Sequence, residues 1–151
     1  MIKIICFGKI KEQYFVDAIK EYQKRISKYA ILNIIELPDY NTDDKKITLK
    51  KEKESLLKIF NNKEYNILLD IEGNMQSSLE LGNKIDKIYN INSNITFIIG
   101  GSYGVDEEIK EMVKYKLSFS KMTFPHQLFR VLLLEQLYRA FKINNNEEYH
   151  K

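Results

Sequence analysis

The stretch ITFIIGGSYGVDEEI, residues 95–109, decides how this sequence is interpreted. Its first five residues are all β-branched or aromatic, which is typical of a buried strand. The strand ends in Gly100 and Gly101, Gly104 follows, and an acidic segment with helical character comes next. A glycine-rich turn between a strand and a helix often receives a ligand, because glycine adopts positive φ and lets the backbone approach a bound molecule. This turn holds three of the six glycines of the chain.

The residues of the turn restrict the kind of ligand. The spacing G-G-x-x-G differs from the dinucleotide fingerprint G-x-G-x-x-G, and no Lys-Ser/Thr pair follows it as in a P-loop. The acidic residues 106–108 suit the positive end of a helix dipole, but they would repel a phosphate. The turn therefore favours a neutral or cationic ligand over a pyrophosphate. A tight turn without any ligand is the alternative.

Outside this turn, strand-like and helix-like segments alternate along the chain. The hydrophobic pattern predicts strands at 2–7, 31–37, 65–71, 95–99 and 117–122, and helices at 11–29, 45–60, 77–89, 106–115 and 125–143. Gly73 is expected to turn the chain after the third strand, and Ser77 or Ser78 to cap the next helix. This alternation predicts an α/β fold with a mostly parallel sheet covered by helices on both faces. No linker or repeat interrupts it, so residues 1–151 form a single domain.

Composition limits where and how the protein works. No apolar run approaches the roughly 20 residues that span a bilayer, and the N-terminus is typical of a strand rather than an export signal. The protein is therefore not expected to be bound to a membrane. Cys6 is the only cysteine, so no disulfide can form within the chain, and a reducing, cytoplasmic location is expected. Cys6 is more readily a small buried hydrophobe than a nucleophile, because nothing nearby lowers its pKa. The net charge of +3 permits binding to nucleic acid without requiring it.

The last expected helix, 125–143, is apolar nearly all round, which predicts that one face packs against another subunit. Glu135 and Arg139 are spaced i,i+4 on it, as in many structural ion pairs. The functional alternative places Arg139 at an active site shared between subunits. His126 at the start of the helix is either structural or catalytic. Two histidines and one cysteine without ligand spacing predict no metal site.

The tail EEYHK, residues 147–151, has two interpretations. It is either a disordered end or a small RNA-contacting arm. In the second case Tyr149 would stack on a base, and His150 or Lys151 would meet a phosphate.

Four segments together resemble one known family: GKIKEQYFVDAIKEYQKRI (8–26), IIGGSYG (98–104), LSFSKMTFPHQLFRVLLLEQLYRAFKI (117–143) and the terminal YHK. They are similar to the ribosomal RNA large subunit methyltransferase H family, small enzymes of the SPOUT class. The resemblance covers essentially the whole chain. It is most specific in 117–151 and weakest in the helix at 43–60.

The resemblance implies a fold and an activity. It implies an α/β domain whose C-terminal part forms a deep trefoil knot, and a homodimer that uses S-adenosylmethionine. The implied reaction is methylation of N3 of a pseudouridine in 23S rRNA, on the assembled ribosome. The residues that match the family's cofactor site are Leu69, Gly100, Phe119, Ser120, Lys121, Met122, Thr123 and Phe124.

The candidates for catalysis are Arg139, His126, Tyr149 and His150. Methyl transfer to a ring nitrogen needs alignment of donor and acceptor and loss of the N3 proton, but no covalent enzyme intermediate. Arg139 would stabilise a developing anion rather than accept a proton, because its pKa is so high. Tail residues of one subunit would complete the site of the other.

Two other classes of protein compete with this interpretation. A nucleotide-dependent oxidoreductase of Rossmann type is disfavoured by the imperfect glycine pattern. A non-catalytic ribosome-binding protein of the same fold would keep the architecture without the chemistry.

Overall fold

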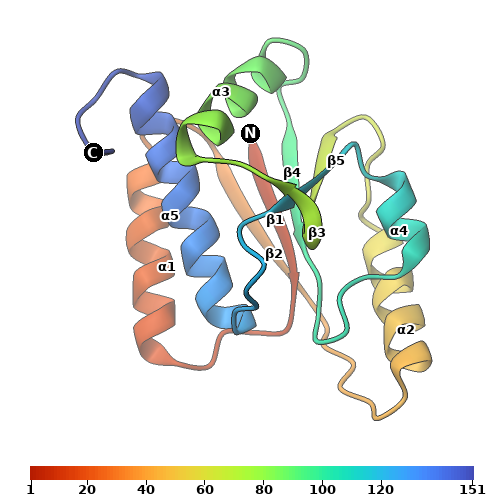
Figure 1. Cartoon of the computed structure of the whole chain (residues 1–151). Coiled ribbons are helices and arrows are strands. Elements are labelled where there is room, and N and C mark those ends of the chain that lie inside the picture. Colours follow the sequence, from red (N-terminus) through yellow and green to blue (C-terminus); the bar gives the residue numbers. More distant parts are fainter.

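The structure, a computed structural model, describes residues 1–151 and contains one five-stranded sheet (Figure 1). All strand pairs are parallel, and the strand order is β2-β1-β4-β3-β5. The strands are β1 (Ile2–Phe7), β2 (Leu32–Leu37), β3 (Tyr65–Met75), β4 (Ile95–Ile99) and β5 (Tyr115–Ser118). The helices are α1 (Gln13–Ile26), α2 (Lys45–Leu57), α3 (Ser78–Tyr89), α4 (Glu107–Met112) and α5 (His126–Asn144). The predicted α/β fold with a parallel sheet is confirmed.

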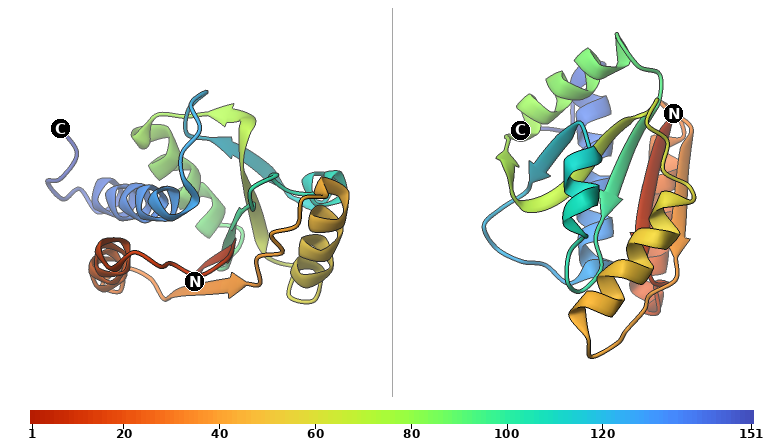
Figure 2. Two further views of the ribbon diagram at one scale, coloured as in Figure 1. Left: turned by 90° about the horizontal axis from the view of Figure 1, so that it is seen from below. Right: turned by 90° about the vertical axis from the view of Figure 1, so that its right-hand side faces the viewer.

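Helices cover both faces of the sheet, as predicted (Figure 2). Helices α1, α3 and α5 pack on one face over a core of 17 buried residues, among them Phe97 and Leu133. Helices α2 and α4 cover the other face over a smaller core of six residues, which includes Leu56 and Ile109. None of the helices combines the length and apolar character needed to cross a bilayer. The knotted path of the C-terminal part stays a prediction.

Two boundaries in the second half of the sheet differ from the predictions. Gly73 was expected to turn the chain, but β3 continues through it to Met75, with a shift of register against β5 between Leu69 and Asn74. A Cβ on Gly73 would lie only 2.7 Å from the carbonyl carbon of Lys116, so glycine serves close approach of the two strands rather than a turn. Strand β5 ends at Ser118 instead of Met122, because residues 119–125 leave the sheet as a loop.

Helix α2 buries an unexpected set of residues. The apolar Leu57 does not face the core, because 37% of its surface is exposed. The buried residues are Thr48, Glu52 and Leu56, which follow one another at i,i+4 spacing and share one stripe of the helix. Two of the three are polar, which is why a search for apolar periodicity does not find this stripe.

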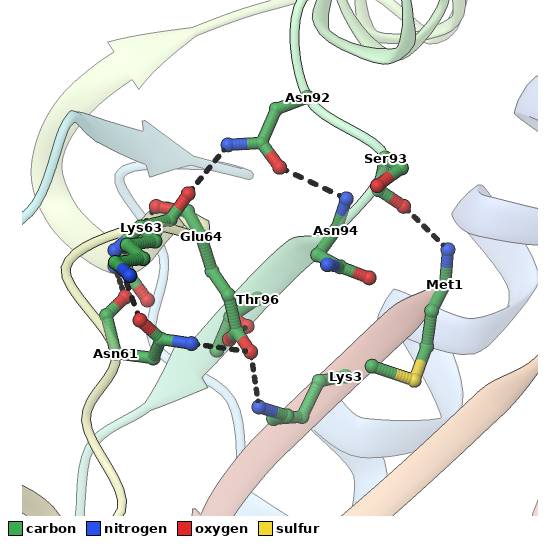
Figure 3. A network of polar contacts seen from close by, with 10 residues as sticks. Met1, Lys3, Asn61, Lys63, Glu64, Asn92, Ser93, Asn94 and Thr96 are labelled. Carbon is green, nitrogen blue, oxygen red and sulfur yellow. Dashed lines mark hydrogen bonds and ion pairs between the residues drawn. The ribbon is translucent and has the colours of Figure 1, made fainter.

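Parallel strands place all their carboxyl ends at one edge of the sheet, and a network of polar contacts holds the opposite edge together (Figure 3). Glu64, just before β3, accepts hydrogen bonds from Lys3 Nζ of β1 at 2.6 Å and from Thr96 Oγ1 of β4 at 2.5 Å. Its side chain is buried. Burial alone would raise the pKa of Glu64, but the hydrogen bonds from Lys3 and Thr96 outweigh it and hold the pKa below its ordinary value of 4.5.

We expect Glu64→Gln to lower the free energy of unfolding by about 1–3 kcal/mol at pH 7, because it leaves the charge of Lys3 without its partner. A carboxylate with a lowered pKa in the folded state stabilises the protein above the unfolded pKa and loses that contribution as the pH falls. The difference between the two proteins should therefore shrink below about pH 4.5. Urea unfolding between pH 3.5 and 8 measures it, with the exposed Glu111→Gln as control. An equal difference at all pH values would contradict the assignment.

Candidate active site at the carboxyl ends of β3, β4 and β5

A cavity of about 500 Å³ opens at the carboxyl ends of three neighbouring strands. Its walls come from residues 68–72 of β3, where the pairing with β5 shifts, from 99–105 at and beyond the end of β4, and from 117–120 with 122–124 at and beyond the end of β5. Lys110 of α4 and His126 and Phe129 of α5 complete the lining. The volume lies within the range of pockets that hold small cofactors. The carboxyl edge of a parallel sheet is where such ligands bind in α/β proteins.

The glycine turn forms one wall of the cavity and is folded tightly on itself. Gly104 has φ +79° and donates its N–H to the Gly101 carbonyl at 3.0 Å. A Cβ on Gly100 would lie 2.7 Å from the carbonyl carbon of Gly104. A side chain at 100 therefore cannot coexist with this turn. The turn presents bare backbone to the cavity, which is the geometry that close approach of a ligand requires.

The loop after β5 forms the opposite wall and is fixed by its own serines. Ser118 Oγ donates to the Ser120 carbonyl at 3.1 Å, and Ser120 Oγ accepts from the Met122 N–H at 3.0 Å. The rings of Phe119 and Phe124 lie 5.0 and 5.9 Å from the ring of Phe129. This aromatic group ties the loop to the first turns of α5, so the wall is built before any ligand arrives.

Seven of the eight predicted cofactor residues line this one cavity. They are Leu69, Gly100, Phe119, Ser120, Met122, Thr123 and Phe124. The eighth, Lys121, is exposed and is not part of the lining. The side chain of Met122 is 75% exposed, so it stands at the rim of the cavity rather than at its base.

The ionisable groups of the cavity make it more acidic than basic. Asp70 and Glu72 line it, and Asp70 Oδ1 accepts the Glu72 N–H at 3.0 Å. Lys110 is already bonded to Glu107 at 3.1 Å, which raises its pKa. His126 is exposed at the rim, where partial desolvation of the ring, followed by the nearby Arg130, lowers its pKa and so favours the neutral ring near pH 7. The lining therefore suits a ligand that carries positive charge and lacks phosphate.

Sequence reasoning missed three of these ionisable residues. Asp70 and Glu72 lie in the segment LLDIEGN (68–74), which the rule that ligands bind beyond strand ends marks without singling out either carboxylate. Lys110 lies in the middle of α4, and no local signal marks it. No group of three or more His, Cys, Asp or Glu side chains is arranged to hold a metal ion.

The tail candidates form a separate cluster at the far end of α5. Arg139 donates to Glu135 Oε1 from Nε at 3.0 Å, and its Nη1 lies 3.3 Å from His150 Nδ1. The guanidinium lies over the ring of Tyr149, at 4.8 Å from the centroid, and the Tyr149 hydroxyl donates to Glu135 at 3.3 Å. The predicted i,i+4 pair is confirmed, and it also holds the tail against the helix.

The structure does not bring all four catalytic candidates together within one chain. His126 lies in the cavity, whereas Arg139 follows thirteen residues later on the same helix. At 1.5 Å per residue this places the backbone of Arg139 about 20 Å along the helix from His126 and about 15 Å from Phe129, and Tyr149 and His150 lie beside Arg139. In one chain only His126 lies where a substrate base at the cavity could be reached.

Cys6 is buried with 1% of its surface exposed, as predicted. Burial raises the pKa of its thiol to about 11, so the thiolate is not formed near neutral pH. Cys6 therefore belongs to the core and not to the chemistry.

Comparisons with known proteins show the family of the chain. Residues 1–150 match the family described as "Predicted SPOUT methyltransferase". A protein of Fusobacterium nucleatum named ribosomal RNA large subunit methyltransferase H is 50% identical, over 99% of both chains. Proteins of the same name from Clostridium acetobutylicum and Clostridium botulinum strain Alaska E43 are 48% and 51% identical, again over 99% of both chains. The chain therefore belongs to the ribosomal RNA large subunit methyltransferase H family of SPOUT methyltransferases.

Proposed function

We propose that this protein is a cytoplasmic homodimer that methylates N3 of a pseudouridine in 23S rRNA on the assembled ribosome, with S-adenosylmethionine as methyl donor. The observation that carries the proposal is the cavity itself, where seven predicted cofactor residues meet beside the carboxylates of Asp70 and Glu72. The names of the relatives support an rRNA of the large subunit as substrate.

The residues of the cavity fit S-adenosylmethionine by shape and charge. The bare backbone of the turn at Gly100 and the loop at 119–124 offer N–H and carbonyl groups to an adenine and a ribose. Leu69, Met122 and Phe124 supply apolar walls. The donor carries its methyl group on a cationic sulfonium, which suits the acidic lining. The pyrophosphate of a nicotinamide cofactor would meet Asp70 and Glu72 instead of a free lysine.

The roles in catalysis follow from position and charge. His126 is neutral near pH 7 because partial desolvation and Arg130 lower its pKa, so its ring can accept a proton at the mouth of the cavity. Arg139 stays protonated and stabilises the anion that forms when N3 loses its proton. Tyr149 and His150 are held beside it and contact the RNA.

Two observations support the dimer. Arg139 and the tail lie about 15–20 Å along α5 from the α5 residues that line the cavity of their own chain, which favours action at the cavity of a partner. Leu128, Val131 and Leu132 of α5 are only partly buried, although they are apolar. A second copy packed on this face would cover these side chains and bring its tail to the cavity. A monomer is also a single small domain with a net charge of only +3, so it offers little surface and little electrostatic attraction to a large RNA.

Calorimetry with the two competing cofactors tests the donor. We expect S-adenosylmethionine to bind in the micromolar range and NAD to show no heat, since the lining repels phosphate. NAD binding with no response to S-adenosylmethionine would overturn the proposal.

Binding to ribosomes without any methyl transfer would instead favour a non-catalytic ribosome-binding protein. The dimer should also modify ribosomes faster than free 23S rRNA.

A further inference from the structure

Helix α2 places a carboxyl group directly beneath the glycine turn, outside the cavity. Glu52 is 3% exposed, and neither of its carboxyl oxygens has a hydrogen-bond partner. Burying a polar group in this way is costly, and an unpaired carboxyl group inside a protein calls for a reason. The proposed chemistry does not use it, because Glu52 does not line the cavity.

Gly101 is the residue that Glu52 touches. A Cβ built on Gly101 would lie 2.7 Å from both carboxyl oxygens of Glu52 and 3.1 Å from its Cδ. The three nearest atoms to that position all belong to Glu52. The carboxyl group therefore fills the space that a side chain at 101 would occupy, and it rests on the backbone of the turn.

Contact at Gly101 reaches the wall of the cavity. Gly101 pairs with Gly104 in an isolated bridge, and Gly100 packs against the backbone of Gly104. All three glycines line the cavity. Any shift of Gly101 therefore moves the surface that we assign to the cofactor.

The segment just before α2 supports the turn a second time. Tyr103 of the turn donates its hydroxyl to the Thr42 carbonyl at 3.3 Å, and the Thr42 and Thr48 hydroxyls lie 2.5 Å apart. Thr48 and Glu52 belong to the buried stripe of α2, one helical turn apart. The stripe thus meets the turn directly through Glu52 and indirectly through Thr48, which contacts Thr42.

We propose that Glu52 is a positioning residue for the cofactor: its carboxyl group, wedged against Gly101, holds the Gly100–Gly104 turn in the shape that binds S-adenosylmethionine. The inference rests on the proposed function for the identity of the ligand. It adds a residue that does not touch the ligand and that acts through Gly101.

The electrostatic surroundings of Glu52 agree with a carboxyl group that supports the turn by its shape rather than by its charge. Burial and the nearby Asp39 raise its pKa to about 7, and the Tyr40 backbone opposes this shift without forming a full hydrogen bond. Lys53 does not neutralise it, because Lys53 is bonded to Glu108 at 3.1 Å and lies 3.7 Å from Asp106. The carboxyl group is therefore largely protonated in mildly acidic solution, where glutamine is its close substitute.

A double-mutant cycle between the two residues tests the wedge. We expect Gly101→Ala to weaken S-adenosylmethionine binding at least about tenfold, because the new methyl group collides with Glu52. In a Glu52→Ala background, Gly101→Ala should weaken S-adenosylmethionine binding less than about twofold, because the space beside Gly101 is then free. Glu52→Gln keeps the shape and should bind within about threefold of wild type at pH 6. Glu54→Ala, an exposed neighbour on α2, is the control.

Glycine amide signals give a second reading that needs no cofactor. In protein labelled with ¹⁵N-glycine the chain yields six signals. Glu52→Ala should shift those of Gly100, Gly101 and Gly104 and leave Gly8, Gly73 and Gly82 in place, whereas Glu54→Ala should shift none. The proposal for Glu52 would be overturned if Gly101→Ala weakened S-adenosylmethionine binding equally with and without Glu52. It would also be overturned if Glu52→Ala left the signals of Gly100, Gly101 and Gly104 unshifted. Shifted turn signals in a protein that does not bind S-adenosylmethionine would instead refute the proposed function alone.

Discussion

Two inactive variants, Gly100→Val and Arg139→Ala, are expected to regain methyl transfer when their chains are paired in one dimer. Valine at 100 cannot fit, because even a Cβ there lies 2.7 Å from the Gly104 backbone, so that chain loses its cofactor cavity. Arg139→Ala removes the proposed anion stabiliser and should lower kcat about 10²–10³-fold. It should leave the affinity for S-adenosylmethionine within about threefold of wild type, because Arg139 is not part of the lining of the cavity and is proposed to act on the RNA base.

The mixed dimer separates a shared site from a site within one chain. If the tail acts across the dimer, the intact cavity of the Arg139→Ala chain meets the intact tail of the Gly100→Val chain, and one of two sites works. Random pairing makes half of the dimers mixed, and one of the two sites works in each mixed dimer. The unfractionated mixture should therefore reach about a quarter of wild-type activity. If each tail serves its own chain, no pairing restores activity. Co-expression with two affinity tags and an assay on ribosomes measures the outcome, and activity no higher than that of the separate variants would refute the shared site.

Replacing Arg130 with methionine should cost about 3–5 kcal/mol of unfolding free energy, the largest effect on stability that we expect. Arg130 is 4% exposed and joins α5 to the end of β1. It donates from Nη2 to the carbonyls of Phe7 and Gly8 at 2.8 and 2.6 Å, and from Nη1 to Glu36 at 2.7 Å. Methionine matches the stem of arginine but leaves all three acceptors without this donor.

Guanidinium unfolding measures this cost, and Arg25→Met is the matched control. Arg25 pairs with Glu21 on the surface of α1, where its side chain is 41% exposed. Such surface pairs contribute about 0–1 kcal/mol, so the control should stay close to wild type. A cost below about 1 kcal/mol at Arg130 would show that water replaces the guanidinium and that the contact does not fix α5 to the sheet.

The order of strands and helices was predictable because burial imposes a period on the sequence. The apolar runs at 2–7 and 95–99 and the capped start of α3 at Ser77 are local signals, and they match the structure. The end of β3 was predicted wrongly because Gly73 is typical of a turn, whereas here it permits contact with β5. That contact joins residues far apart in the sequence. The buried polar stripe of α2 was missed for a similar reason, since its partner is a turn 49 positions further along, from Glu52 to Gly101.

The cofactor residues were predicted largely through the resemblance, and the structure adds how they fit together. Spacing alone indicated that the glycine turn is unsuited to phosphate, and the carboxylates of Asp70 and Glu72 give that interpretation a physical basis. The catalytic candidates show the limit of the sequence. His126 and Arg139 lie on one helix, yet their separation along it assigns them to different places in the monomer. Only the three-dimensional distance between them leads us to propose that a second chain completes the site.

Transfer of a labelled methyl group from S-adenosylmethionine to ribosomes tests the central claim most directly. Two sets of ribosomes serve as substrates, one with the pseudouridines of 23S rRNA and one from cells unable to form them. We expect label in 23S rRNA of the first set, recovered by mass spectrometry as N3-methylpseudouridine, and little or none in the second. Equal label in both sets would contradict the pseudouridine substrate, and no label in any ribosomal particle would contradict the proposed activity itself.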